Sequence, residues 1–413
     1  MKKTLFALLV ASLLIIAGCS KDNVNLVEVS LTVNLPGDEP IEQPQTMATA
    51  GDPAVGFDVT FINTATQAET KVQTDAQGVA RAKVEEGVYN VSVYGTVEKN
   101  GKETIYQYNL NNQSIVAPVE GSGATGVTLP AIIPELAQVS GGWVIKEVYT
   151  SGTRTQAGKA YWGDQYIALY NNSNQVLYAD SLVIGMSSKF TNDNTDQEYL
   201  SQYLPDKVVP DLLFQIPGSG KDHPVQPGEC FILANQGLDH TKLANSKADM
   251  SKADFEWVDE GTSLDVDVPE VPNAVTVYGY SLTINIFSVQ SNRAYFIFRP
   301  TEKNWIEQLK TTIVYPSGMS EEMYPVPSKD IIDGVQLCPK GSVLNSPSLP
   351  SSVDTGYSYV GENEGDSGSY LGLCVSRKIK EKTADGRYIL QDTNNSSNDF
   401  LPNQEPSPYE VKE

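Results

Sequence analysis

The segment "ILQDTNNSSNDFLPN" near the C-terminus carries residue types that can hold a hard cation. Asp392, Asn394 and Asp399 supply oxygen atoms at short spacing, and Ca²⁺ prefers oxygen ligands. The segment lacks the central glycine and the distal glutamate of an EF-hand loop. A turn that closes a domain also has this composition, because Asn and Asp side chains accept hydrogen bonds from nearby backbone amides. We favour the turn and keep these three residues as weak metal candidates.

Other residues of chemical interest give no convergent catalytic set. His223 and His240 are the only histidines, and they flank an expected strand, which would strain a shared metal site. "GDSGS" at 365–369 resembles the surroundings of a serine nucleophile, but glycine-rich loops have the same composition. With 51 acidic residues, carboxylate pairs for glycoside hydrolysis cannot be selected from the sequence. No nucleotide-binding glycine motif occurs, so no cofactor and no catalytic residues are predicted.

Aromatic residues are the better candidates for ligand binding. The chain has 21 tyrosines, several of them in polar or glycine-rich segments such as "AYW" and "GYSYVGENEGDSGSY". Exposed Tyr and Trp side chains stack on sugars or anchor protein partners. Most tyrosines of a β-sandwich lie in its core or at its corners, which is the alternative for each of them. We predict Tyr161, Trp162, Tyr357 and Tyr359 as ligand-binding aromatics.

Charge narrows the range of partners. The formal net charge is −22, which would repel phosphate backbones, so no nucleic acid is expected as a partner. The segment "SRKIKEK" at 376–382 is the one basic cluster, and it contains an acid itself. Beside Cys19, the cysteines are Cys230, Cys338 and Cys374. Cys338 and Cys374 could pair, and three buried thiols are equally consistent with this wide spacing.

The first 20 residues, "MKKTLFALLVASLLIIAGCS", predict that the protein is targeted to a membrane. Two lysines precede an apolar run too short to span a bilayer, which is typical of a secretory signal peptide over 1–18. The small residues ending at Cys19 resemble a bacterial lipoprotein signal, and this resemblance implies lipidation of Cys19. Ser20 favours the outer membrane. We therefore expect a lipid-anchored outer-membrane protein on its periplasmic or cell-surface face, with residues 19–26 as a tether.

The elements that would present these residues are strands. "VEVSLTVNL" alternates apolar and polar residues, as a strand with one buried face does, and Asp75 to Gly78 form an expected turn. The patterns "TDAQGVA" and "EEGVYNV" are similar to those of prealbumin-like or carboxypeptidase-regulatory-like sandwiches. This resemblance predicts an immunoglobulin-like sandwich over 27–130. The proline-containing segment 131–142 is the expected linker.

The remainder predicts a second sandwich. "GDQYIALYNNS" and "DSLVI", followed by "VQPGECFILA", "IIDGV" and the segment at 376–400, resemble a lamin-tail-type immunoglobulin sandwich. We predict this domain over 143–405, with a large insertion at about 238–324 and a tail at 406–413. The fold class is therefore all-β, with two β-sandwich domains in tandem.

The arrangement as a whole resembles an uncharacterised family of Bacteroidetes-type outer-membrane lipoproteins. The resemblance implies a fold and a location but no activity. We expect a non-catalytic envelope protein that binds or presents a ligand or partner, as an accessory to a TonB-dependent transporter. The alternative is an envelope hydrolase acting on glycans or phosphoesters, with its site in the central insertion.

Overall fold

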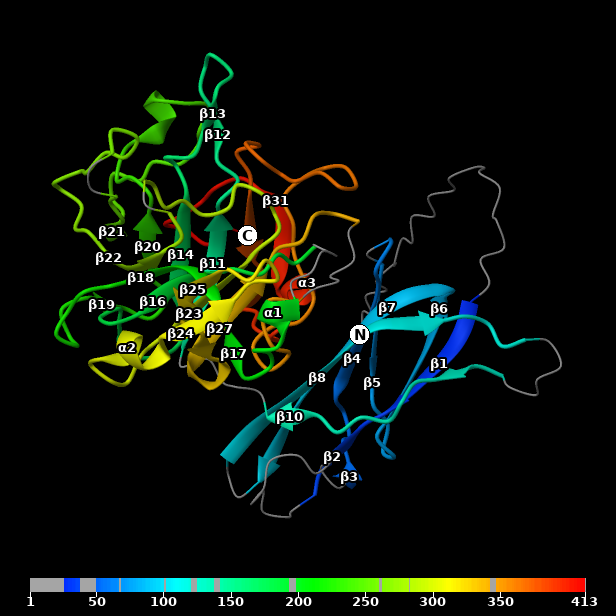
Figure 1. The fold of residues 1–413 in the computed structure, drawn as a ribbon. Helices are drawn as coiled ribbons and strands as arrows, with labels where there is room; N and C mark the ends of the chain where they lie inside the picture. Colours follow the sequence, from blue (N-terminus) through cyan, green and yellow to red (C-terminus); the bar gives the residue numbers. More distant parts are fainter. Residues whose placement is uncertain are drawn as a thin grey trace, which may run out of the picture.

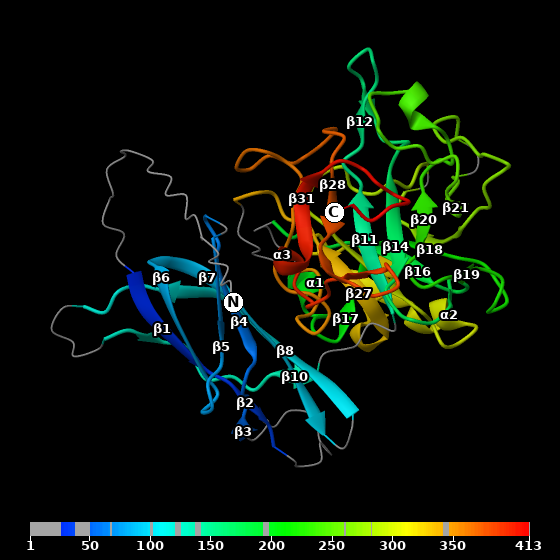
Figure 2. The same ribbon diagram turned by 180° about the vertical axis from the view of Figure 1, so that it is seen from behind.

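The computed structural model describes residues 26–37, 50–66, 68–99, 102–119, 125–136, 142–192, 198–259, 262–281, 283–341 and 347–412. Two lobes of β-structure lie side by side, a first lobe at 26–136 and a second at 142–412 (Figures 1 and 2). The predicted all-β fold class is confirmed. The signal peptide, Cys19 and the start of the tether lie outside the described residues.

Two sheets form the first lobe. The smaller sheet has the order β6-β1-β9, with β6 at Val79–Glu85, β1 at Leu26–Thr32 and β9 at Val127–Thr128. The larger sheet has the order β10-β8-β7-β4-β5, with bounds Glu135–Leu136, Lys102–Ile115, Gly87–Lys99, Asp58–Asn63 and Glu69–Gln73. A short pair, β2 (Asn34–Pro36) and β3 (Ala50–Pro53), extends the lobe. β10 lies in the segment expected as a linker, where Ile132 is also buried in the core.

The core of this lobe follows from the alternation in the sequence. Val29 and Leu31 of β1 and Phe61 of β4 are fully buried between the sheets. The predicted turn at Asp75–Gly78 joins β5 to β6, and Gly78 adopts a positive φ of 70° there. A side chain at Gly78 would also meet the Val33 carbonyl oxygen at 2.4 Å, so this turn requires glycine.

Two larger sheets form the second lobe and pack around one extended core. The six-stranded sheet has the order β21-β20-β14-β11-β28-β31, with bounds Phe255–Glu256, Cys230–Ala234, Tyr166–Asn171, Trp143–Tyr149, Cys374–Arg377 and Phe400–Gln404. The five-stranded sheet has the order β22-β18-β16-β23-β27, with bounds Val275–Gly279, Pro210–Gln215, Val183–Ser187, Ala294–Phe298 and Ile331–Gln336. Phe214 and Trp257 stack between them with ring centroids 4.7 Å apart.

The segment expected as an insertion contributes to both sheets of this lobe. β21 pairs with β20 in the six-stranded sheet, and β22 pairs with β18 in the five-stranded sheet. β23 lies between β16 and β27, at an interior position of its sheet. Residues 238–324 therefore include strands on which the sandwich itself is built.

Short hairpins and helices surround the second lobe. The hairpins are β12 (Thr153–Arg154) with β13 (Ala160–Tyr161), β24 (Thr311–Val314) with β25 (Ser320–Met323), and β29 (Ile379–Lys382) with β30 (Tyr388–Leu390). Two further two-stranded sheets join segments distant in the chain: β15 (Leu177–Tyr178) with β19 (Pro224–Val225), and β17 (Lys207–Val208) with β26 (Val326–Pro327). The helices are α1 (Glu198–Ser201), α2 (Trp305–Leu309), α3 (Ser396–Asp399), η1 (His240–Lys242) and η2 (Ser328–Asp330). In the described part of the chain, none of the helices has the length and apolar character needed to cross a bilayer.

Candidate functional site

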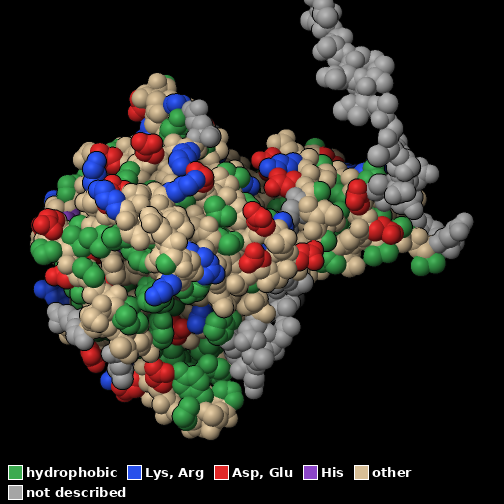
Figure 3. All heavy atoms as spheres, turned by 90° about the horizontal axis from the view of Figure 1, so that it is seen from above, with side chains coloured by type: hydrophobic (Ala, Val, Ile, Leu, Met, Phe, Trp, Pro, Cys, Tyr) green, Lys and Arg blue, Asp and Glu red, His purple; other side chains and the backbone are tan. Residues whose placement is uncertain are grey.

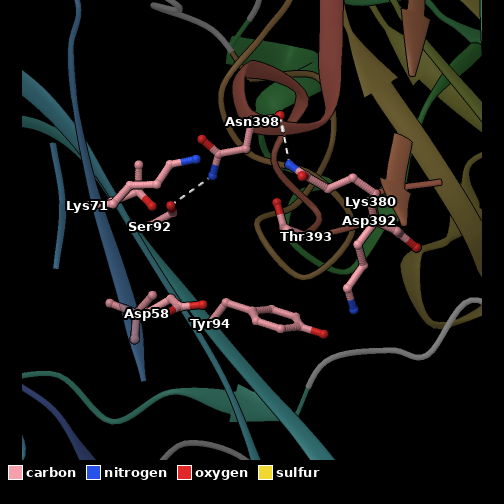
Figure 4. Close-up of a pocket in the computed structure, with 11 residues that line it drawn as sticks. Asp58, Lys71, Ser92, Tyr94, Lys380, Asp392, Thr393 and Asn398 are labelled. Atoms are coloured by element: carbon pink, nitrogen blue, oxygen red, sulfur yellow. Dashed lines mark hydrogen bonds between the residues drawn. The ribbon is translucent and has the colours of Figure 1, made fainter. Parts of the chain in front are cut away.

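A cavity of about 250 Å³ lies where the two lobes meet, and we call it the inter-lobe cleft. One wall is the outer face of the five-stranded sheet of the first lobe. The other wall is the hairpin β29–β30 and the turn that leads into α3 (Figure 4). The lining residues are Asp58, Thr60, Lys71, Ser92, Val93, Tyr94, Lys380, Gln391, Asp392, Thr393 and Asn398.

Strand register places the first wall. Thr60 of β4 pairs with Lys71 of β5 on one side and with Ser92 of β7 on the other, so these side chains form one row. Asp58 and Tyr94 pair with each other two residues further along and lie on the same face. Val59 and Phe61 point into the core of the first lobe. Because side chains alternate between the two faces of a strand, the polar residues next to them point outward, toward the second lobe.

The second wall depends on a capped turn. The Asn395 side chain accepts hydrogen bonds from the amides of Ser397 and Asn398, at 3.0 and 3.4 Å, and so caps α3. The Asp399 carboxylate accepts bonds from the amide and the hydroxyl of Thr393, both at 2.8 Å. This geometry supports the interpretation of the segment as a domain-closing turn. Its exposed edge presents Thr393 and Asn398 to the cleft.

A buried arginine fixes this wall from behind. The Arg377 guanidinium donates to Asp333 Oδ2 at 2.6 Å and to Asp392 Oδ1 at 3.2 Å. It also donates to the carbonyl oxygens of Ile145 and Gln391, at 2.7 and 3.0 Å. Arg377 is 4% exposed, so these bonds replace its water shell. The guanidinium thereby ties the cleft wall to β11 and β27 of the second lobe.

Direct contact between the lobes occurs at the cleft. The Asn398 amide nitrogen donates to the Ser92 hydroxyl at 2.8 Å (Figure 4). Lysines also gather here: Lys71 pairs with Glu69 at 3.2 Å, and Lys380 extends from β29 into the cleft. Partial burial lowers the pKa of the neighbouring Lys378, against the attraction of Glu69 and Asp399.

The four predicted aromatics lie elsewhere. The Tyr161 hydroxyl is 2.7 Å from His240 Nδ1, and burial raises its pKa to about 12. Trp162 is half-buried and uses its backbone carbonyl to accept from Asn235. Tyr357 is buried, and the Tyr359 ring lies beneath the Lys340 ammonium at 5.7 Å. None of the four lines the inter-lobe cleft, whose aromatic residue is Tyr94.

The metal candidates have partners within the protein. Asp392 pairs with Arg377, and Asp399 is occupied by Thr393 and by the Asn395 amide at 3.2 Å. The Asn394 side chain donates to the Ser352 carbonyl oxygen at 3.3 Å. Within the described ranges, no group of three or more His, Cys, Asp or Glu side chains is arranged to hold a metal ion.

The cysteines and histidines do not form a shared site. Cys230, Cys338 and Cys374 are present as thiols, so Cys338 and Cys374 do not pair with each other. Burial raises the pKa of the Cys230 thiol to about 11. His240 is buried, with Nε2 2.9 Å from the Gln236 carbonyl oxygen, whereas His223 packs edge-on against Phe255.

The cleft residues are ones that the sequence alone does not select. Thr60, Ser92 and Tyr94 occupy ordinary outward positions of amphipathic strands, and only the placement of the second lobe gives them a shared role. One signal was visible in the sequence: the basic cluster at 376–382 supplies both Arg377 and Lys380.

Comparison with known proteins points to an uncharacterised family. Residues 226–407, all in the second lobe, match the model of "Protein of unknown function (DUF4876)". The crystal structure of a DUF4876 family protein from Bacteroides thetaiotaomicron is similar over 92% of this chain and 96% of that chain, with a TM-score of 0.58 and 23% identity. Together these matches support the resemblance to an uncharacterised Bacteroidetes-type family and to its fold.

Two further comparisons add nothing to the assignment. The structure of the fimbrial protein FimP from Actonomyces oris matches over 50% of this chain and 51% of its own, with 14% identity. Its TM-score of 0.17 is too low to carry an argument. No curated protein matches the chain.

Proposed function

We propose that this protein is a non-catalytic lipoprotein of the bacterial outer membrane that binds a small polar ligand in the inter-lobe cleft. The cleft carries the proposal because both lobes contribute hydrogen-bonding side chains to one preformed cavity, a usual property of small-molecule sites. Lipid on Cys19 would place this cavity beside the membrane. There it would serve as an accessory that presents its ligand to a TonB-dependent transporter.

The hydrolase alternative would place its site in residues 238–324, where two buried acids fix loops. Burial raises the pKa of Glu256 to about 7, and its carboxylate accepts from the amides of Gly237 and Val268, both at 2.6 Å. Asp265 accepts from the amides of Asp259 and Val266, at 2.7 and 2.9 Å. Since these oxygens hold backbone, the observations favour binding in the cleft over hydrolysis in this segment.

The anchor is tested by labelling. Cells expressing the full chain are grown with radioactive palmitate and compared with cells expressing Cys19→Ser. We expect label on the wild-type protein in the outer-membrane fraction, and none on the variant. An unlabelled wild-type protein recovered with the soluble fraction would contradict the anchor.

Ligand binding is tested by native mass spectrometry of protein purified from its own envelope in mild detergent. We expect a bound small molecule on the wild-type protein and its loss from Tyr94→Ala, which removes the aromatic ring from the cleft. Tyr280→Ala is the matched control, because Tyr280 is 47% exposed and directly follows β22, a strand on the side of the second lobe away from the first (Figure 1). Equal spectra for all three proteins would argue against a ligand in the cleft.

A further inference from the structure

Lysines from both lobes line the inter-lobe cleft of a strongly acidic protein, beside Asp58 and Asp392. The chain has a net charge of −22, and both signs are interspersed over the face in Figure 3. At the cleft, however, Lys71 comes from β5 and Lys380 from β29, and Lys378 lies close enough to Lys71 for the two charges to repel. Lys380 of the basic segment 376–382 thus lines the same cleft as Lys71 of the first lobe.

The charges at the cleft are unequally compensated. Asp392 pairs with the buried Arg377, and Asp58 accepts a bond from Gln73 at 2.9 Å. The Lys71 ammonium lies 3.2 Å from a carboxylate oxygen of Glu69, and the Lys71 side chain is 68% exposed, so water screens this ion pair. Within the described residues, Lys380 makes no ion pair, and Figure 4 shows its ammonium extending toward the same part of the cleft as the Tyr94 hydroxyl. A ligand with one anionic group would supply the missing partner.

The rest of the lining has a different character. Thr60, Ser92 and Thr393 offer hydroxyls, Gln391 and Asn398 offer amides, and Asp58 offers a carboxylate. A ligand that satisfies these groups must both donate and accept hydrogen bonds, as vicinal hydroxyls do. The Tyr94 ring adds a flat surface on which a sugar ring can stack. A polyphosphate fits less well, because Asp58 and Asp392 would repel its several charges.

We propose that the cleft binds an acidic saccharide, whose hydroxyl groups contact the polar walls and Lys71 and whose carboxylate or sulfate pairs with Lys380. This inference rests on the proposed ligand-binding function and names its ligand class. The cavity of about 250 Å³ accommodates one or two sugar rings. Because the lysines are solvent-exposed, the affinity falls as salt is added.

The test uses the full lipidated chain in detergent on a glycan array that carries neutral, uronate-containing and sulfated oligosaccharides. Affinities for a retained glycan are then measured by calorimetry for Lys71→Gln and Lys380→Gln. Lys83→Gln on the other sheet of the first lobe and Lys221→Gln in the loop between β18 and β19 are the matched controls. We expect acidic glycans to be retained over their neutral parents, each cleft variant to weaken binding about tenfold, and the controls to bind as the wild type does.

The outcomes separate this inference from the proposed function. Retention of uronates but not sulfated glycans, or the reverse, supports the inference and identifies the acid. If neutral glycans are retained as well as acidic ones, and neither Lys71→Gln nor Lys380→Gln changes the affinity, the acidic class is overturned, but a ligand in the cleft is still supported. No glycan retained, together with a native-mass-spectrometry ligand that Tyr94→Ala removes, overturns the saccharide alone. If no ligand is found by either method, both proposals fail.

Discussion

The core of the first lobe is apolar, whereas the second lobe also buries charges. In the first lobe, the buried polar side chains among the described residues are neutral, such as Thr60, Thr74 and Asn90. The second lobe encloses Arg377 with Asp333 and Asp399, and it encloses Lys146 beside Glu147. Arg377 pairs with Asp333 across 44 residues, and the Lys146 ammonium also donates to the Pro408 carbonyl oxygen, 262 residues away. The second lobe is therefore specified by pairings that local alternation does not reveal.

The buried arginine should produce the largest difference between the lobes. Arg377→Met leaves Asp333 buried without its cation, so we expect a loss of about 3–5 kcal/mol in the unfolding free energy of the second lobe. The matched change in the first lobe is Arg81→Met, which removes an exposed partner of Asp75 and should cost less than about 1 kcal/mol. Urea unfolding monitored by tryptophan fluorescence measures the first effect, because the tryptophans lie in the second lobe. If both variants lost similar amounts of unfolding free energy, the buried arginine of the second lobe would not differ from the exposed one of the first.

A truncation in the apolar core should destabilise the first lobe by a somewhat smaller amount. Leu31 is fully buried between its sheets, so Leu31→Ala leaves a cavity and should cost about 3 kcal/mol. Leu26→Ala on the same strand is the control, because Leu26 is 60% exposed. Calorimetry should show a lower melting temperature for the first lobe and an unchanged second transition. A shift of both transitions would mean that the lobes unfold together.

The same contrast explains which parts of the structure could be predicted from the sequence. Alternation in "VEVSLTVNL" predicts the inward residues of β1, and the Asp75–Gly78 turn is where it was expected. The local capping expected in the segment 392–400 is also observed, because the Asn395 side chain caps the short helix α3 and Asp399 accepts from Thr393. By contrast, the cleft joins Ser92 to Asn398 across 306 residues, and no local pattern encodes that contact. The aromatic candidates share this problem, since Tyr161 is held by His240, 79 residues away.

Proton binding should affect the two lobes in opposite directions. Burial raises the pKa of Asp164 in the second lobe to about 6, so its contribution is fully present below about pH 4 and is lost as pH rises through 6. In the first lobe, the Val79 amide lowers the pKa of Asp75, so its contribution is present above about pH 4 and is lost as pH falls. Each pKa unit corresponds to about 1.4 kcal/mol, which gives up to about 3 kcal/mol for Asp164.

Thermal melts between about pH 2 and 7 test this prediction, because the contribution of Asp75 is lost below about pH 4 and that of Asp164 is lost above it. Asp164→Asn should reduce the decline of the second lobe toward pH 7 but not abolish it, because burial also raises the pKa of Glu256 to about 7. The neutral amide can still accept from the Tyr149 hydroxyl, which lies 2.6 Å from the carboxylate. Asp75→Asn should instead remove the decline of the first lobe toward low pH. If Asp164→Asn and the wild type lose stability in parallel, Asp164 does not titrate in this range.

The smallest effect is expected at the contact between the lobes. Asn398→Ala and Ser92→Ala each remove one side of a 2.8 Å hydrogen bond and should each cost about 1 kcal/mol. The Asn395 cap of α3 is retained in both variants, so a loss should report on the inter-lobe bond and not on the helix. In a double-mutant cycle, we expect an interaction energy of about 1 kcal/mol, because the second deletion has no further bond to break. Additive losses would mean that the lobes do not hold this contact in solution, and the cleft would then lose one of the two walls that define it.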